Sequence, residues 1–463
     1  MSGIAYAGEY DLREMKILTS AGNVIDVKNI VQVIEIFEDI NSPSLSGNIT
    51  ILDIDNIMEN APMIGQEYLS LKISTPSLEE EMIDFGENIF AIYKTLSKEN
   101  AANDAQIYTF SFCSPELLRS NRTKVSKSYT DTIDKIIENV LRDSRYINTR
   151  KKLFLETTSG TRKVIAPNIR PFTFIKNLTD EALSTKYNSP HFFFYENTKG
   201  IHFKTLQGMY AEGTKGDFNT GDLEFLEGND TQPNPENVFQ RVLEFQVNTS
   251  RDMLLNTRGG MLGSKIFIHN LFNKNINDFN FRYFDDFDEL PRIDENPIYN
   301  NSAIDEENRT IGDFPDSKIF VHPASVRDNR YLDDASYDNP NNDYTYKATG
   351  VFASLQRRSS KLLELNYGVN VSMKITGNTT IAAGQLINII VPVTGRMHDK
   401  ENDQYMSGNY LITKLRHIFT QADKKHEIAL NAVKDSLPKE YPINADSREP
   451  FGDKSESIEI NYT

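Results

Sequence analysis

The stretch from Asp403 to Leu437, DQYMSGNYLITKLRHIFTQADKKHEIALNAVKDSL, decides the fold class of this chain. Its apolar residues alternate with polar ones in two runs, and alternation with a period of two predicts half-buried β-strands. Two earlier segments continue the pattern. The predicted strands are ELNYGVNVSMKITG (364–377), QLINIIVPVTG (385–395), SGNYLITKLRHIF (407–419) and KKHEIALNAV (424–433). We therefore expect β structure from Tyr344 to about Asp435.

A second β-rich region occupies the first 115 residues. Its runs are dense in β-branched and aromatic residues and are separated by Gly, Pro, Ser and Asn, which is typical of antiparallel barrels and sandwiches. The predicted strands lie in VIDVKNIVQVIEIFEDI (24–40), NITILDI (48–54), EYLSLKIST (67–75), ENIFAIYKTLS (87–97) and QIYTFSFCS (106–114). The single cysteine, Cys113, falls in the last run and is expected to face a core as a small apolar residue.

The character changes to α+β between residues 121 and 215. In SYTDTIDKIIENVLRDS (128–144) the apolar residues recur at helical spacing, which predicts an amphipathic helix capped by Ser128 or Thr130. A second helix is expected to begin at Pro171, because proline suits the first helical turn. Its predicted buried residues are Phe174, Ile175 and Leu178.

The segment HFFFYENTKGIHFKTL (191–206) predicts a hairpin around a turn that contains Asn197 and Gly200. In such a hairpin His191 and His202 would face each other across the two strands and supply half a metal site. A zinc site needs further ligands, so a packed cross-strand pair is the favoured interpretation.

Two polar stretches interrupt the pattern further along. Residues 216–236 are rich in Gly, Asn and Pro and fit a linker, after which strand patterns return in VFQRVLEFQVNTS (238–250) and SKIFIHNLF (264–272). Residues 273–343 form a long acidic stretch, and a loop of this length usually has a task or a small fold of its own. Its acidic residues include Asp285, Asp286, Asp288, Glu289, Asp294, Glu295, Asp305, Glu306 and Glu307.

The chain ends in a proline-punctuated tail that follows Leu437. In its last segment, SESIEINYT (455–463), Ile458, Ile460 and Tyr462 alternate with polar residues, so the segment is able to add as a strand to another sheet. A frayed end is the ordinary alternative for terminal residues. We favour a docked arm.

Composition bounds the class of protein. A chain of 463 residues with 25% charged and 38% hydrophobic residues has room for about three folded domains. The net charge of -16 argues against a protein that grips duplex DNA or an anionic membrane, although a conduit through which DNA slides is compatible with it. No signal peptide pattern and no apolar stretch approaching the ~20 residues of a membrane span is present, so we expect no membrane insertion.

Motifs for catalysis or cofactor binding are missing from the sequence. One cysteine cannot form an intrachain disulfide or a multi-thiolate metal site. RGGMLGSK (258–265) has the wrong glycine spacing for a phosphate loop and is expected to turn the chain between two strands. FDDFDEL (284–290) lacks the glycine and final glutamate of a calcium loop, so a solvated acidic loop is favoured. We assign no catalytic, cofactor-binding or metal residue, expect no cofactor and do not expect an enzyme.

The order of the segments resembles the central hub proteins of phage tail baseplates, a family shared with contractile injection and type VI secretion spike hubs. The C-terminal region (362–437) resembles their closing barrel through these residues: Gly377, Asn378, Gly384, Ser407, Gly408, Tyr410, His417, Lys434 and Asp435. RPFTFIKNLTDEALS (170–184) followed by the hairpin segment matches their helix, aromatic strand, Glu-Asn turn and returning strand. The first barrel matches only in its strand pattern, and the acidic stretch has no counterpart.

The resemblance implies a mainly β fold with two antiparallel tail-tube-like β-barrels, an inserted α+β domain and an acidic loop-rich insertion. The implied parts are a first barrel (1–120), the α+β domain (121–215), a linker with the first strands of the second barrel (216–272), the acidic insertion (273–343), the remainder of the second barrel (344–436) and an extended C-terminal arm (437–463) that reaches a neighbour or a spike.

The same resemblance implies a homotrimer whose six barrels close a pseudo-hexameric ring between a six-fold tail tube and a three-fold spike. Implied partners are the tail tube protein, a spike or needle protein, a tape-measure protein and peripheral baseplate proteins, with DNA only in transient passage through the lumen. The protein is then expected in the virion, in the tail baseplate, after assembly in the host cytoplasm. The negative charge either repels DNA from the lumen or serves only solubility, and both interpretations stay open.

Two alternatives remain beside the phage hub. The first is a hub of a bacterial secretion or contractile toxin machine with the same architecture. The second is a cell-wall or polysaccharide hydrolase with its acids, such as Asp286 and Asp288, in the acidic stretch. No site for that chemistry is visible in the sequence, so the structural assembly protein is the favoured hypothesis.

Overall fold

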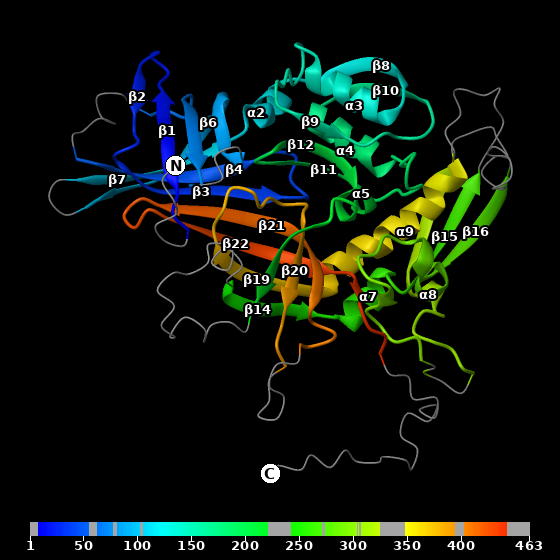
Figure 1. Cartoon of the computed structure of the whole chain (residues 1–463). Coiled ribbons are helices and arrows are strands. Elements are labelled where there is room, and N and C mark those ends of the chain that lie inside the picture. Colours follow the sequence, from blue (N-terminus) through cyan, green and yellow to red (C-terminus); the bar gives the residue numbers. More distant parts are fainter. Residues whose placement is uncertain are drawn as a thin grey trace, which may run out of the picture. The chain divides into compact units, whose positions relative to one another are not determined.

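A computed structural model describes residues 8–54, 63–76, 81–101, 105–220, 242–270, 274–302, 304, 307–324, 348–393 and 402–441 of the chain. The fold is mainly β, and antiparallel pairs predominate (Figure 1). The chain divides into two compact units. Unit 1 comprises Met1–Asn248, Asp338–Lys347 and Asn370–Lys434, and unit 2 comprises Thr249–Tyr337, Ala348–Val369 and Asp435–Thr463.

Unit 1 is built on one long sheet that joins the N-terminal and C-terminal strand regions. Its main path runs through β14 (Val242–Ser250), β19 (Val369–Thr376), β22 (Lys425–Lys434), β21 (Gly408–Thr420), β3 (Val31–Asp39), β4 (Ser46–Asp53), β7 (Gln106–Cys113), β6 (Ile83–Asn100), β5 (Tyr68–Ser74), β1 (Asp11–Leu18) and β2 (Val24–Asp26). Beside this path, β20 (Leu386–Ile390) pairs with β21 and, in parallel, with β13 (Thr214–Asn219). The two strand regions meet where β3 pairs with β21, from Lys414 opposite Asp39 to Thr420 opposite Val33.

The predicted N-terminal strands are confirmed, and β3 and β4 bury every second side chain, whereas β7 buries four consecutive residues at its end. Ile34, Ile36 and Phe110 belong to one large apolar core, and Cys113 is also buried. The sequence did not indicate β1, because a bulge between Leu12 and Glu14 breaks the regular alternation on which the prediction rests.

The α+β part of unit 1 lies between β7 and β13. Its elements are α2 (Pro115–Arg122), β8 (Val125–Asp131), α3 (Ile133–Arg142), β9 (Leu153–Leu155), β10 (Arg162–Ile169), α4 (Pro171–Asp180), β11 (Phe192–Asn197), β12 (Gly200–Thr205) and α5 (Leu206–Tyr210). Both predicted helices and the hairpin of β11 and β12 are confirmed. The predicted cap is wrong: Ser128 and Thr130 pair with β10 inside β8, and the residue before α3 is Thr132.

Unit 2 contains a second, smaller sheet and the longest helix. Its elements are α7 (Met253–Gly259), β15 (Gly263–Asn270), β16 (Asn275–Arg282), α8 (Tyr283–Asp286), η3 (Phe287–Glu289), β17 (Asn296–Pro297), η4 (Pro315–Ser317), β18 (Ile319–Ala324), α9 (Ala348–Tyr367) and β23 (Ser436–Leu437). The sheet has the order β16, β15, β18, and α9 packs across one of its faces (Figure 1). Strands and short helices thus occupy much of the acidic stretch, while residues 325–347 lie outside the described residues.

The helix α9 corrects the expectation of continuous β structure from Tyr344. Residues Glu364–Tyr367, predicted as the start of a strand, form its last turn, and the strand begins at Val369. The helical signal was hidden because the buried side of α9, where its side chains are described from Leu355 on, is mostly polar. Its buried members are Gln356, Ser360, Lys361, Glu364 and Leu365. No helix of the described segments is long and apolar enough to cross a membrane.

Two further local predictions need correction. RGGMLGSK does not join two strands: its first residues end α7, Gly260 closes that helix at a φ of 86°, and β15 begins at Gly263. Of the predicted linker, 216–219 belong to β13, and 221–236 lie outside the described residues.

A buried lysine fastens the α+β part to the long sheet. The Lys151 ammonium lies 2.8 Å from Glu116 and 2.5 Å from Glu196 and is 4% exposed. Glu196 also accepts hydrogen bonds from the Leu45 backbone at 3.1 Å and from Ser114 at 2.9 Å. Burial alone would lower the pKa of Lys151, but the two carboxylates hold that pKa above its ordinary value.

Replacing Lys151 by methionine is expected to lower the free energy of unfolding by about 3–5 kcal/mol, because two buried carboxylates would lose their cation. Urea unfolding at neutral pH measures the change. The matched control is Lys152→Met, at an exposed neighbour, with an expected loss below about 1 kcal/mol. Equal losses for the two variants would contradict the role given to Lys151.

Candidate functional site on the polar face of the long sheet

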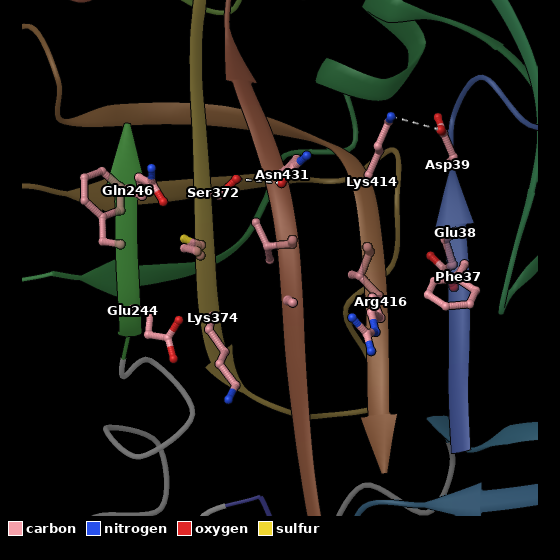
Figure 2. Close-up of a pocket in the computed structure, with 15 residues that line it drawn as sticks. Phe37, Glu38, Asp39, Glu244, Gln246, Ser372, Lys374, Lys414, Arg416 and Asn431 are labelled. Carbon is pink, nitrogen blue, oxygen red and sulfur yellow. Dashed lines mark hydrogen bonds and ion pairs between the residues drawn. The ribbon is translucent and has the colours of Figure 1, made fainter. Parts of the chain in front are cut away.

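Five neighbouring strands of unit 1 present a polar surface, here called the polar face (Figure 2). Arg416 of β21 stands opposite Ala429 of β22 and Phe37 of β3, and the next rows continue the same register. Side chains alternate across a strand, so the neighbours of Arg416, Leu415 and His417, are buried on the other side. The charged and amide residues of the polar face are Glu35, Asp39, Glu244, Gln246, Lys374, Lys414, Arg416, Lys425, Glu427 and Asn431.

The polar face carries a shallow hollow of about 620 Å³. It lies over β3, β14, β19, β21 and β22, and Figure 2 shows these strands side by side with the labelled side chains upon them. Ser372 donates to Asn431 at 2.8 Å in its floor. The hollow is lined by hydrogen-bonding and charged groups from strands far apart in the sequence.

Each cation of the polar face has an acidic neighbour on it. Lys374 lies 2.8 Å and Lys425 2.6 Å from Glu427, while Lys414 lies 3.6 Å from Asp39. Arg416 pairs with Glu35. Partial burial opposes the ionised form of Glu427, but hydrogen bonds from the two lysines hold its pKa below the ordinary value.

Counted over the polar face, charge is balanced. The basic residues are Lys374, Lys414, Arg416 and Lys425, and the acidic ones are Glu35, Asp39, Glu244 and Glu427. The chain as a whole carries -16, so this surface differs from the average of the molecule. Partly exposed ion pairs contribute about 0–1 kcal/mol each to stability. Their main effect is on the charge that this surface presents to other molecules.

Beneath the polar face lies a buried cluster of Glu38, His417 and His426. The Glu38 carboxylate accepts from the backbone of Thr198 at 2.8 Å and of Ala383 at 2.6 Å. His417 Nδ1 is 3.1 Å from His426 Nε2, and burial lowers the pKa of His426 well below its ordinary value. These contacts tie β3, β21 and β22 to the hairpin and to the loop before β20.

A second buried cluster, in unit 2, holds the point where the C-terminal tail begins. The Lys361 ammonium lies 2.8 Å from Asp435 and 2.5 Å from Glu364, with all three side chains fully buried. Burial raises the pKa of Glu364 to about 7, against the opposing charge of Lys361. Asp435 and Ser436 accept from the Ile293 backbone at 3.0 Å each, so the first tail residues are fixed.

The predicted cross-strand pair of His191 and His202 is wrong. His202 pairs with Tyr195 across the hairpin, whereas His191 precedes β11 and contacts Ser189 at 2.9 Å. The His202 ring stacks between Phe154 and Tyr195, with centroid separations of 4.5 and 4.9 Å. Within the described segments, no group of three or more His, Cys, Asp or Glu is placed to hold a metal ion.

The acidic residues singled out in FDDFDEL do not form one site. Asp286 pairs with Arg357 at 3.2 Å and Asp288 pairs with Arg292 at 2.5 Å, while Asp285 lies 3.8 Å from Arg282. Each carboxylate thus faces a different arginine. The polar face was missed by motif reasoning, although a signal for it exists: Lys414 and Arg416 occupy the polar phase of the same alternation that predicts β21.

Burial of His202 predicts a pH dependence of folding. Burial, together with the charges of Lys204 and Lys152, lowers the pKa of His202 to about 3 from 6.5. Between pH 7 and 5 the unfolded chain therefore takes up a proton that the folded chain does not bind. The free energy of unfolding is expected to fall by about 2 kcal/mol from this group over that range.

The variant His202→Phe keeps a ring in the stack and is expected to remove that part of the pH dependence in urea unfolding series. Phe154→Leu disturbs the same stack without removing the titrating group, so its pH dependence should match that of the parent chain. If the free energy of unfolding changed with pH equally in His202→Phe and in the parent chain, His202 would not be the group responsible.

In comparisons with known proteins, the chain is similar to baseplate and tail proteins. No family model matches it. Over 407 residues, covering 84% of this chain and 87% of the relative, it is 21% identical to the probable baseplate hub protein gp334 of Vibrio phage KVP40. The resemblance to hub proteins that the sequence predicts is therefore confirmed.

Two solved structures share the fold. A tail protein from Neisseria meningitidis MC58 has a TM-score of 0.51 at 9% identity and covers 94% of this chain and 100% of its own. The 43 kDa tail protein of prophage MuSo2 from Shewanella oneidensis has a TM-score of 0.51 at 9% identity, covering 91% of this chain and 98% of its own. The mainly β fold is thus a tail-protein fold over nearly the whole chain.

Proposed function

We propose that this chain, which resembles phage baseplate hub proteins, is the structural hub of a tail baseplate. In this proposal three copies form a pseudo-hexameric ring that joins the six-fold tail tube to a three-fold spike and lets DNA pass. The observation that carries it is the long sheet: strands from both ends of the chain join through β3 and β21 and present one continuous polar face. The shared fold with tail proteins supports the same role.

The two tube-like barrels are part of this proposal. The first comprises the strands within 1–120, and the second those within 216–272 and 344–436, with 121–215 inserted and 273–343 as the acidic insertion. Along the main path of the described sheet, β14 and β2 are the terminal strands. Pairing such edges between neighbouring copies would close a ring and remove exposed strand edges, which are a liability in β proteins.

The polar face is proposed to line the passage. Its four cations each have an acidic neighbour, and its acidic and basic residues balance. DNA binds through unpaired basic groups that displace counterions from phosphates, so a surface of this kind offers little grip. The proposed lumen is therefore neutral and polar over these strands, and the overall acidity of the chain resides elsewhere on its surface.

The proposed partners follow from this place in the particle. They are the tail tube protein, a spike or needle protein, a tape-measure protein and peripheral baseplate proteins, with an arm from 437 to 463 reaching a neighbour or the spike. The protein would be found in the virion, after assembly in the host cytoplasm. A hub of a secretion or toxin machine would use the same surfaces, whereas a hydrolase finds no support in the separate ion pairs of Asp286 and Asp288.

The proposed trimer is expected to show a mass of three times the 52.8 kDa chain. Light scattering of the purified chain, alone and with the tube and spike proteins of its own particle, measures this. The mass should not change on reduction, since Cys113 is buried and its burial raises the pKa of the thiol to about 12. A chain that stays monomeric with both partners present would refute the ring.

The proposed passage is tested with Asn431→Cys, at an exposed position of the polar face. In the trimer, a small biotin maleimide is expected to label this thiol, while streptavidin, which is too bulky for a narrow lumen, should not bind the label. Ile165→Cys, on β10 at 69% exposure, is the matched control and should bind streptavidin in full. Equal streptavidin binding at both positions would contradict the placement of the polar face in the lumen.

A further inference from the structure

The small sheet of unit 2 has one covered face and one open face. On the covered face, Ile266 and Ile268 pack with Phe320 and with Leu355 of α9. On the open face, Ile319 is 49% and Val321 71% exposed. Ile276 of β16 is also exposed, at 62%, and stands opposite His269 in the register of the sheet. Ile319 and Val321, exposed β-branched residues on the same face of β18, form an apolar surface that an added strand is suited to extend.

The edge of this sheet is also open. Among the described residues, β18 pairs only with β15, and that pairing is parallel. The Lys265 backbone N–H donates to the Lys318 carbonyl at 2.8 Å, so the backbone groups of Lys318 point towards β15. Backbone groups alternate along a strand, so those of Ile319 and Val321 point to the open edge. Ile319 and Val321 thus offer both their backbone hydrogen-bonding groups and their apolar side chains to an added strand.

We propose that the C-terminal segment Ser455–Thr463 of the same chain adds to the open edge of β18. Its sequence, SESIEINYT, places Ile458, Ile460 and Tyr462 at alternate positions, so one side of an added strand would be apolar. That side would extend the open apolar face beside Ile319 and Val321. The polar residues between them, Ser457, Glu459 and Asn461, would turn to the opposite side, where Lys318 is exposed at the start of β18.

The segment is within reach of the sheet. The tail begins at Asp435, whose carboxylate is held by Lys361 of α9, and Leu355 of the same helix packs on the sheet. Lys361 and Leu355 are six residues apart, which is about 9 Å along a helix. Thirteen residues, 442–454, separate the described end of the tail from Ser455. Such a linker spans about 20 Å as a coil and at most about 45 Å when extended.

This geometry favours the tail of the same chain over that of another copy. A segment tethered by a linker of this length has an effective concentration in the millimolar range, far above that of a second copy at micromolar protein. The docked strand would convert the C-terminal arm into a closed loop. Residues 442–454 of that loop, and not the docked segment, would then be available to a neighbour or spike. The inference does not depend on the proposed trimer.

Disulfide trapping tests the placement, on a background in which the native Cys113 is buried. The double variant Val321→Cys with Ile460→Cys is expected to form an intrachain disulfide under mild oxidation, detected as a linked peptide pair by mass spectrometry. The matched control pairs Val321→Cys with Glu459→Cys, whose side chain would point to the opposite side. The control should cross-link at least about tenfold more slowly.

Three outcomes of trapping would overturn the proposal. Equal rates for the double variant and the control would mean that the tail samples the surface without docking. Cross-linking that arises mainly between chains, on mixing the two single variants, would mean that another copy supplies the segment. No cross-link in a chain that otherwise folds and assembles would remove the contact and leave the proposed hub function untouched.

Hydrogen exchange gives a second measurement that leaves the sheet itself unaltered. In the full chain the amides of Ile319 and Val321 are expected to be protected. The tail variant Ile458→Asp with Ile460→Asp should speed their exchange by at least about tenfold. Ser457→Asp with Asn461→Asp is the matched control, since it adds the same two charges on the other side of the segment, and should leave the protection in place. Unchanged exchange in the isoleucine variant would also overturn the proposal.

Discussion

The pairing of β3 with β21 is the interaction on which the rest of unit 1 depends. It joins a strand near the start of the sequence to one near its end, with Val33 opposite Thr420 and Asp39 opposite Lys414. Without it, the N-terminal strands and the C-terminal strands would form separate sheets with two additional exposed edges. Such long-range contacts carry the entropic cost of closing a very long loop. They therefore form only when the alternating apolar residues of the strands on both sides already favour strand structure.

That pairing also fixes which residues share a face. A shift of one residue in the pairing of β3 with β21 would turn the buried side chains of Ile34 and Ile36 to the polar face and bury their polar neighbours. The register is therefore strongly determined. The polar face follows from the core, because side chains alternate along each strand. Once one set of alternate side chains is buried in the core, the other set must contact solvent or a passing molecule. Glu38 is an exception in the buried phase, and its backbone donors, Thr198 and Ala383, compensate its burial.

Regular strands and amphipathic helices could be predicted from the sequence, because their signal is local. The strands β3, β4, β21 and β22 and the helices α3 and α4 follow from periodicity alone. The first strand, β1, could not be found in this way because of its bulge. The polar face was within reach of the same alternation. The ion pairs that join its strands were not, because residues such as Arg416 and Glu35 meet only through the fold.

The sequence did not predict helix α9, and the physical reason also explains how the first residues of the tail are held in unit 2. Lys361 has Glu364 as a local partner three residues away, but its second partner, Asp435, arrives from the end of the sequence. A periodicity argument counts Lys361 as surface, since nothing nearby in the chain reports that a carboxylate will neutralise it. An apolar contact at this point would tolerate sliding by a residue or more, whereas a buried lysine between two carboxylates accepts one arrangement. The first tail residues are therefore positioned by charge, and the segment beyond them begins from a fixed point on α9.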